Sequence, residues 1–478
     1  MRTVRTFLSD HRQLAVGVVI GALLAAWAMP TGGDADTTEI VPRRIASAPP
    51  SERMRRDPEV VQMMRDVSTQ RLRRDLTALV DFGTRNTLSP QDDPERGIGA
   101  AVDYMVDAFE EIAETAGGRM EVERQTFTQT IAGQQVPVTN VIATLHGTQP
   151  ESADRIYVIS GHLDTRCSQT NNGECDAPGA NDDGSGVVSL LEAARVMAPH
   201  SFDATIKFMA VSGEEQGLLG STYFAEQAFQ QGWDIEGMLN FDVVGNTVGG
   251  NGLSTPRRIR VFSEGVPWTE TTQQANRRRQ VGGENDGPSR QLARYIETVA
   301  ETYTPDFEVW MINRQDRFGR GGDHRPFLER GYSAVRFTEP FENYDQQHQT
   351  PRVEDGRVFG DFLEYIDFDY LTNVTQLQVA TLASLANAPA IPENARLLTG
   401  GGTDPYSVTA AWNIGDEPDL AGYEIVWRDT TSPVWTDYRS FGVVDRGTVV
   451  NLSRDNTMVG VRAVDRDGNK SPVAFASR

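Results

Sequence analysis

Residues 155–164 (RIYVISGHLD) and 205–215 (TIKFMAVSGEE) share one design: a short apolar run leads into glycine and ionisable side chains. Apolar runs of this length, when they alternate with longer segments of helical periodicity, predict buried strands connected by helices. In largely parallel sheets, chemistry gathers at the carboxyl ends of the strands. The two stretches therefore predict an α/β domain whose functional site lies at that edge of the sheet.

The same alternation continues on both sides of these two stretches. Further strands are expected at the other short apolar runs, which are residues 140–145, 237–244, 259–262 and 333–337. Helices are expected where apolar residues recur at helical spacing, at residues 58–82, 100–116, 186–197, 221–230 and 289–303. We therefore expect one large α/β domain over residues 58–390, and we expect it to carry the functional site.

A second unit is expected at the C-terminal end of the chain. The proline- and glycine-rich segment 388–402 indicates a domain boundary. Beyond it, apolar and polar residues alternate between turn signals at residues 408–412, 422–427, 446–452 and 458–464. Residues 403–478 are therefore predicted to form an all-β sandwich.

The N-terminal residues are typical of an export signal. Arg2, Arg5 and Arg12 precede an apolar run over residues 14–29 that contains the small-x-small pattern ending at Ala28. We expect residues 1–28 to be a signal peptide or an uncleaved inner-membrane anchor, and residues 29–57 to be a linker. Either alternative places the folded part of an exported bacterial protein in the periplasm or the medium.

The net charge of the chain limits its possible binding partners, and its two cysteines indicate a disulfide. The chain has 67 acidic and 45 basic residues and a net charge of −22, which excludes nucleic acid as an expected partner and leaves membrane contact to an uncleaved N-terminal segment. In an oxidising compartment, Cys167 and Cys175 are expected to form a disulfide. Free thiols or soft metal ligands are the alternative, although two cysteines are too few for a structural zinc site.

The first candidate for chemistry is the pair His162 and Asp164 at the end of one predicted strand. Residues two apart in an extended chain project to the same face. A histidine that binds a metal commonly has its second ring nitrogen anchored by a carboxylate. His162 is thus a candidate ligand and Asp164 its partner, while a hydrogen-bonded structural histidine is the alternative interpretation.

Paired and buried acids supply the other candidates. Asp182 and Asp183 precede a predicted helix, where one of them could serve only as a cap. Glu214 and Glu215 would repel each other at a strand end unless they are solvated or a cation lies beside them. Asp242 follows a buried-strand pattern, where an unpaired carboxylate is costly.

Two further histidines, His324 and His348, follow in the segment 319–348. The combined set supplies histidine and carboxylate ligands on successive strand-end loops. It is sufficient for two metal ions that share one carboxylate. Mixed imidazole and carboxylate ligands favour zinc, with cobalt or manganese as substitutes.

This order of motifs resembles the cocatalytic zinc peptidases of metallopeptidase family 28, which includes bacterial aminopeptidases, glutamate carboxypeptidases and the transferrin receptor ectodomain. The resemblance covers residues 71–388 and implies a zinc-exopeptidase fold, a mixed and largely parallel sheet sandwiched by helices. It implies that Glu214 is the general base and that Asp164 orients one metal ligand. The implied ligands of two zinc ions are His162, Asp182 as the bridge, Glu215, Asp242 and His348.

The sequence departs from the family pattern near the substrate pocket. Gln347 stands where relatives often have a tyrosine, and Tyr344 could substitute for it. His324 is our second choice for the imidazole ligand. Arg320 stands close to the sequence position at which some relatives have an arginine that holds substrate. These three residues, His324, Arg320 and Tyr344, are tentative substrate-binding residues.

The resemblance predicts an aminopeptidase that acts on the N-terminal bonds of peptide substrates. A carboxypeptidase or a glutaminyl cyclase on the same scaffold is the alternative, and a binding ectodomain without metals is a third. The tail resembles a fibronectin type III module, with Trp412 and Tyr423 at expected places. Thr457 stands at the position of the usual corner tyrosine.

Overall fold

The structure, a computed structural model, describes residues 38–39, 54–399, 404 and 406–477. The predictions for residues 1–28 and for most of the linker lie outside this part of the chain. The helices are α1 (Pro58–Arg65), α2 (Thr69–Asp81), α3 (Ile98–Ala113), α4 (Ser185–Met197), α5 (Leu219–Gln231), α6 (Thr272–Val281), α7 (Pro288–Tyr303), α8 (Arg325–Leu328) and α9 (Phe368–Ala386). Short helical turns lie at Glu114–Ala116, Ala180–Gly184 and Leu363–Tyr365.

The strands of the N-terminal part are β1 (Thr38–Glu39), β2 (Met120–Ile131), β3 (Gln134–Leu145), β4 (Arg155–His162), β5 (Thr205–Val211), β6 (Asp234–Phe241), β7 (Leu253–Ser254), β8 (Arg258–Ser263), β9 (Glu308–Ile312), β10 (Ala334–Thr338), β11 (Arg352–Glu354) and β12 (Arg357–Phe359). Those of the C-terminal part are β13 (Arg396–Leu397), β14 (Ser407–Ala411), β15 (Leu420–Asp429), β16 (Asp437–Phe441), β17 (Arg446–Val450), β18 (Thr457–Asp465) and β19 (Ala474–Phe475).

An eight-stranded sheet forms the centre of the N-terminal part, in the order β2-β3-β5-β4-β6-β10-β8-β9. Its four middle strands, β5, β4, β6 and β10, are parallel, whereas β2, β3 and β8 introduce antiparallel pairs on either side. All eight residues of β4 are buried, because helices cover both of its faces. This explains why its residues 156–159 are continuously apolar instead of alternating.

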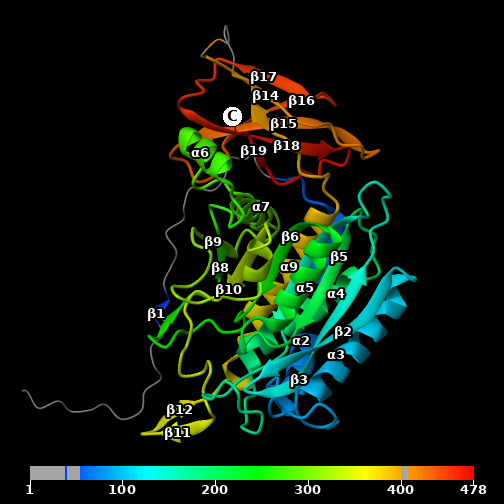
Figure 1. The fold of residues 1–478 in the computed structure, drawn as a ribbon, viewed down its shortest axis with the longest axis vertical. Coiled ribbons are helices and arrows are strands. Elements are labelled where there is room, and N and C mark those ends of the chain that lie inside the picture. The colour runs from blue at the N-terminus through cyan, green and yellow to red at the C-terminus, as the bar shows by residue number, and fades with distance from the viewer. Residues whose placement is uncertain (1–37, 40–53, 400–403, 405, 478) are drawn as a thin grey trace, which may run out of the picture. The chain divides into compact units, whose positions relative to one another are not determined.

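Helices pack on both faces of the sheet (Figure 1). One face contributes residues such as Ile159 and Phe208 to a core shared with α4, α7 and α9. The other face contributes Val158 and Met209 to a second core with α5 and α8. The mixed, largely parallel sheet sandwiched by helices is therefore confirmed. Every helix of the described residues is too short or too polar to span a lipid bilayer.

Several elements differ from the sequence-based prediction. The single helix expected over residues 58–82 is divided into α1 and α2, because the Ser68 side chain accepts a hydrogen bond from the Arg71 amide and starts a new helix. The helix α9 was not predicted. Fifteen of its residues are buried, so its sequence lacks the polar stripe that marks a surface helix.

The C-terminal part is all-β, as predicted. It consists of two antiparallel sheets in the orders β13-β14-β17 and β16-β15-β18-β19. Trp412 and Tyr423 pack in the core between them, with ring centroids 5.1 Å apart. Strand β13, at residues 396–397, lies upstream of residue 403, where we expected the module to begin.

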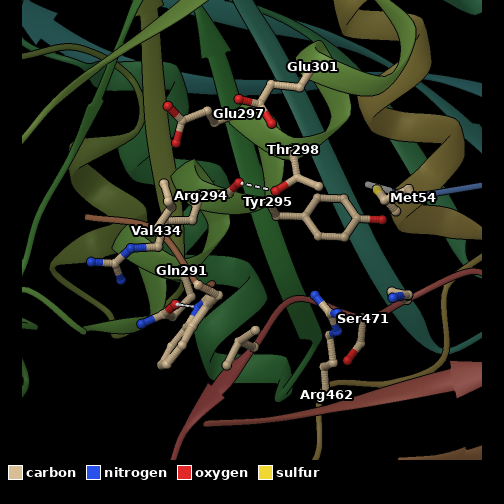
Figure 2. A pocket seen from close by; sticks show the side chains of 13 residues that line it. Met54, Gln291, Arg294, Tyr295, Glu297, Thr298, Glu301, Val434, Arg462 and Ser471 are labelled. Carbon is tan, nitrogen blue, oxygen red and sulfur yellow. Dashed lines mark hydrogen bonds between the residues drawn. The ribbon is translucent and has the colours of Figure 1, made fainter. Parts of the chain in front are cut away.

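Buried polar contacts join α7 and the loop before it to the C-terminal sheets. Asp286 contacts the guanidinium of Arg428 through both carboxylate oxygens at 2.8 Å and that of Arg294 at 3.0 Å. The Trp435 indole donates a hydrogen bond to Gln291, which Figure 2 shows beside a pocket at this junction. The module is therefore attached by a desolvated ion triad.

We predict that Asp286→Ala destabilises the protein by about 3–5 kcal/mol, because the substitution leaves two buried guanidinium groups without their carboxylate. Denaturant-induced unfolding measures the effect. Asp445→Ala, which removes an exposed ion pair with Arg446, is the control and should leave the unfolding midpoint unchanged. Equal stability of the two variants would contradict the structural role of the triad.

Candidate metal centre

Five side chains that the sequence singled out converge at the carboxyl ends of the parallel strands. His162 ends β4, while Glu215 and Asp242 follow β5 and β6. Asp182 lies in the short turn before α4, and His348 lies in the loop after β10. The parallel arrangement brings residues together that are up to 186 positions apart in the sequence (His162 to His348).

The five side chains form two triads that share Asp182. In the first triad, Nε2 of His162 lies 3.0 Å from Oδ1 of Asp182 and 3.8 Å from Oδ1 of Asp242. In the second triad, Nε2 of His348 lies 2.9 Å from Oδ2 of Asp182 and 3.0 Å from Oε1 of Glu215. Asp182 thus turns one carboxylate oxygen toward each triad.

This donor set fits zinc. Each triad offers one imidazole nitrogen and two carboxylate oxygens, all within 4.8 Å of one another, and zinc binds these donor types with open positions left for water or substrate. Oε1 of Glu215 is buried and lies 3.0 Å from Nε2 of His348, although the two groups are not aligned as a hydrogen bond. A buried carboxylate oxygen without a well-aligned donor is costly unless a cation lies beside it.

The charges of the cluster also indicate a cation site. Burial opposes protonation of His162, but its hydrogen bond to Asp182 and the charge of Asp242 raise its pKa well above the usual value. Burial likewise opposes protonation of His348, while Asp182 and Glu215 raise the pKa to about 10. Burial raises the pKa of Glu214 well above its usual value. The surrounding carboxylates therefore favour positive charge at the centre.

Main-chain amides hold the acidic loops in place. The Asp164 carboxylate accepts hydrogen bonds from the amides of Glu214 (3.1 Å) and Glu215 (3.2 Å). Nδ1 of His162 lies 2.9 Å from the Asp164 carbonyl oxygen and 3.8 Å from its carboxylate. Asp164 therefore connects the β4 loop to the β5 loop, and its contact with the His162 ring is made chiefly by the main chain.

Two further aspartates that support the site were not assigned a role from the sequence. The Asp183 carboxylate accepts hydrogen bonds from the amides of His162, Gly186 and Val243. The Asp361 carboxylate accepts the amides of Asn181 and Asp182 at 2.7–3.0 Å. The adjacent acids at 182 and 183 thus face different ways, since the first points into the triads and the second binds the ends of β4 and α4 and the loop after β6.

The tentative substrate-binding residues lie outside both triads. His324 is fully buried, its Nε2 lies 3.0 Å from the Gln315 carbonyl oxygen, and burial lowers its pKa to about 4. The structure thus places His348, and not His324, with the carboxylates. Arg320 forms an ion pair with Glu342 at 2.9 Å and lies 6.0 Å from the ring of the exposed Tyr344.

A disulfide joins Cys167 and Cys175 in the loop after β4. Within this ring, Ser168 exchanges two hydrogen bonds with Thr350, of 3.0 and 3.3 Å. His348 itself has a left-handed backbone, with φ of +56°. The closed ring is therefore attached to the segment that carries the second imidazole.

Comparison with known proteins identifies the class. The family model described as Peptidase family M28 matches residues 140–366. A probable zinc metalloprotease of Pyrenophora tritici-repentis is 43% identical over 88% of this chain and 87% of its own length. Another from Pyricularia oryzae is 44% identical over 88% and 84%. LapA of Legionella pneumophila has the same fold, with a TM-score of 0.51 and 22% identity over 70% of this chain and 78% of LapA.

The fold and these relatives together define a zinc-dependent hydrolase that acts on peptides. The chain belongs to peptidase family M28. The family resemblance inferred from the motif order is thereby confirmed.

We predict that chelation makes stability depend on pH through His348. The pKa of His348 is raised from 6.5 to about 10 in the folded state. The contribution of His348 to the free energy of unfolding is therefore complete below pH 6.5 and is lost as the pH rises toward 10. The melting temperature of chelator-treated protein should therefore fall across this range. His348→Ala should make the fall shallower, whereas His200→Ala, which removes a histidine outside the triads, should not. An identical pH profile for His348→Ala would exclude this coupling.

Proposed function

We propose that this peptidase is an aminopeptidase that holds two zinc ions, one in each triad. The observation that carries the proposal is the shared carboxylate of Asp182, with one oxygen directed at each histidine. Zinc held there would polarise the scissile carbonyl and lower the pKa of a water molecule. His162 and Asp242 complete the first site, and Glu215 and His348 complete the second. Cobalt or manganese would suit the same donors.

Glu214 is the proposed general base. It precedes Glu215 in the β5 loop, and its main-chain position is fixed by the hydrogen bond from its amide to Asp164. Burial raises its pKa, which matches a carboxylate that takes a proton from the attacking water and passes it to the leaving amine. Asp164 fixes the position of this loop relative to His162.

We predict that Glu214→Gln lowers kcat about 10²–10⁴-fold, the range that general acid–base catalysis contributes, because the amide cannot accept the proton. Both zinc ions should remain bound, since Glu214 belongs to neither triad. Steady-state kinetics and metal analysis on the same preparation measure the two effects. Glu226→Gln, a surface substitution at an ion pair with Arg330, is the matched control. Near-normal turnover of Glu214→Gln would remove this residue from the mechanism.

The charge around the triads supports the choice of a free N-terminus as the substrate group. Asp323 is fully buried near the centre, its Oδ2 has no hydrogen-bond partner among the described residues, and burial raises its pKa to about 7. When ionised, Asp323 and Glu214 add negative potential beside the triads, and a substrate ammonium group would stabilise this ionised form. A carboxypeptidase would instead require exposed cations there. The side chains of Arg166 and Arg320 are 21% and 30% exposed and could supply such a cation, so a carboxypeptidase remains an alternative. A glutaminyl cyclase is the other alternative.

We predict that short peptides with a free α-amine are cleaved and that their N-acetylated counterparts are not, because acetylation removes the charge that the carboxylates would bind. Rates on matched peptide pairs, with the released N-terminal residue identified, test this. Peptides with C-terminal glutamate and peptides with N-terminal glutamine serve as probes of the two alternatives. Faster release of a C-terminal residue would make the enzyme a carboxypeptidase.

We further propose that the protein is exported and that its tail is a fibronectin type III module. The Cys167–Cys175 disulfide supports an oxidising compartment such as the periplasm or the medium. The three- and four-stranded sheets of the tail support the module assignment. Its ion triad with Asp286 suits a packing role, since the contacts lie on α7 and the loop before it and not at the strand ends that carry the proposed zinc ligands.

A further inference from the structure

The environment of Asp242 differs from that of Asp164 and Asp183, the two aspartates that support the acidic loops. Asp164 and Asp183 are held by main-chain amides, but among the described residues no amide donates to the Asp242 side chain. Its Oδ1 instead lies 2.7 Å from Nη2 of Arg336 and 3.8 Å from Nε2 of His162. A predicted zinc ligand is therefore in contact with a guanidinium group.

Arg336 is fully buried on β10, opposite Asn240 in the neighbouring strand β6. Its Nη1 donates a hydrogen bond to the Gly321 carbonyl oxygen at 2.8 Å and lies 3.5 Å from the Asp316 carboxylate. These contacts fix one edge of the guanidinium group, while Nη2 forms the ion pair with Oδ1 of Asp242. A fixed, desolvated cation of this kind constrains the carboxylate more strongly than a solvent-exposed pair would.

The chain also leaves space for this guanidinium. A Cβ atom at Gly322 would collide with Nη1 of Arg336. A glycine at this position thus lets the segment after β9 lie directly over the arginine. Among the described residues, the arginine that contacts Glu215, the terminal carboxylate of the other triad, is the partly exposed Arg166, at 3.9 Å. The two triads therefore differ in how their outer carboxylate is held.

We propose that Arg336 is a positioning residue for Asp242, and that the zinc site of the first triad depends on it while the site of the second does not. The inference rests on the proposed function, because it takes Asp242 as a zinc ligand. The arginine orients the carboxylate toward His162 and Asp182 and compensates part of its charge. Removal of a group that holds a metal ligand in this way commonly lowers the metal affinity about 10–100-fold.

The test measures zinc affinity by competition with a chelator, on wild-type protein and on Arg336→Met. We expect one of the two zinc ions to bind about 10–100-fold more weakly in the variant, with the other unchanged. Arg317→Met is the matched control, because Arg317 is a buried arginine of the same network that contacts Asp316 and Glu342 but no predicted ligand. It should bind both ions as the wild type does.

Gly322→Ala provides a second variant that retains the arginine and displaces it, so that a folding defect of Arg336→Met does not decide the outcome. It should weaken the same ion, and circular dichroism of each variant checks its fold. Unchanged affinity in both variants, or tighter binding from relief of charge repulsion, would overturn the inference. Equal loss in Arg317→Met would also overturn it, because the effect would then belong to the whole network.

Wild-type protein and Asp242→Asn separate this inference from the proposed function. If the wild type binds two zinc ions and Asp242→Asn loses one, the proposed centre stands whatever Arg336→Met does. If Asp242→Asn retains both ions at wild-type affinity, the assignment of Asp242 as a ligand is wrong. The proposed centre then fails together with the inference.

Discussion

The site depends on electrostatic repulsion among carboxylates that the fold buries close together. Asp182, Glu215 and Asp242 would each be more stable in water, and their burial becomes acceptable only when positive charge lies between them. The two histidines take this role in the described chain, and this is why the pKa values of both are raised. Two divalent ions would perform the same function without protons. The acidic loops, the parallel strands that deliver them and the buried aspartates behind them all serve this arrangement.

Local patterns in the sequence predicted most of the central fold. The strands β4, β5, β6 and β10 are short apolar runs that end in glycine or acidic residues, so their ends and their site residues could be located together. The division of α1 from α2 was missed because a serine N-cap competes with a continuous apolar stripe. Helix α9 and strand β2 were missed for opposite reasons. The first is buried on nearly all sides, and the second alternates charged residues with few apolar ones.

The residues that hold the site in place could not be predicted in the same way. Asp361 supports Asp182 from 179 positions away, and Arg336 on β10 contacts Asp242 at the end of the neighbouring strand β6. Neither lies in a recognisable motif, since a supporting carboxylate or guanidinium requires only correct placement in space. The adjacent pair 182 and 183 gave one hint, because a single acid suffices for a helix cap. Its second member proved to bind three main-chain amides.

The small ring closed by Cys167 and Cys175 has a consequence for how the protein reaches its working state. Through Ser168 and Thr350 the ring is fastened to the loop on which His348 adopts a left-handed backbone, a conformation that costs a residue other than glycine about 1–2 kcal/mol. Sulfur oxidation and ligand placement are thus mechanically linked. A chain whose two cysteines are reduced would have its second imidazole on a looser loop, so formation of the disulfide would favour assembly of the second triad.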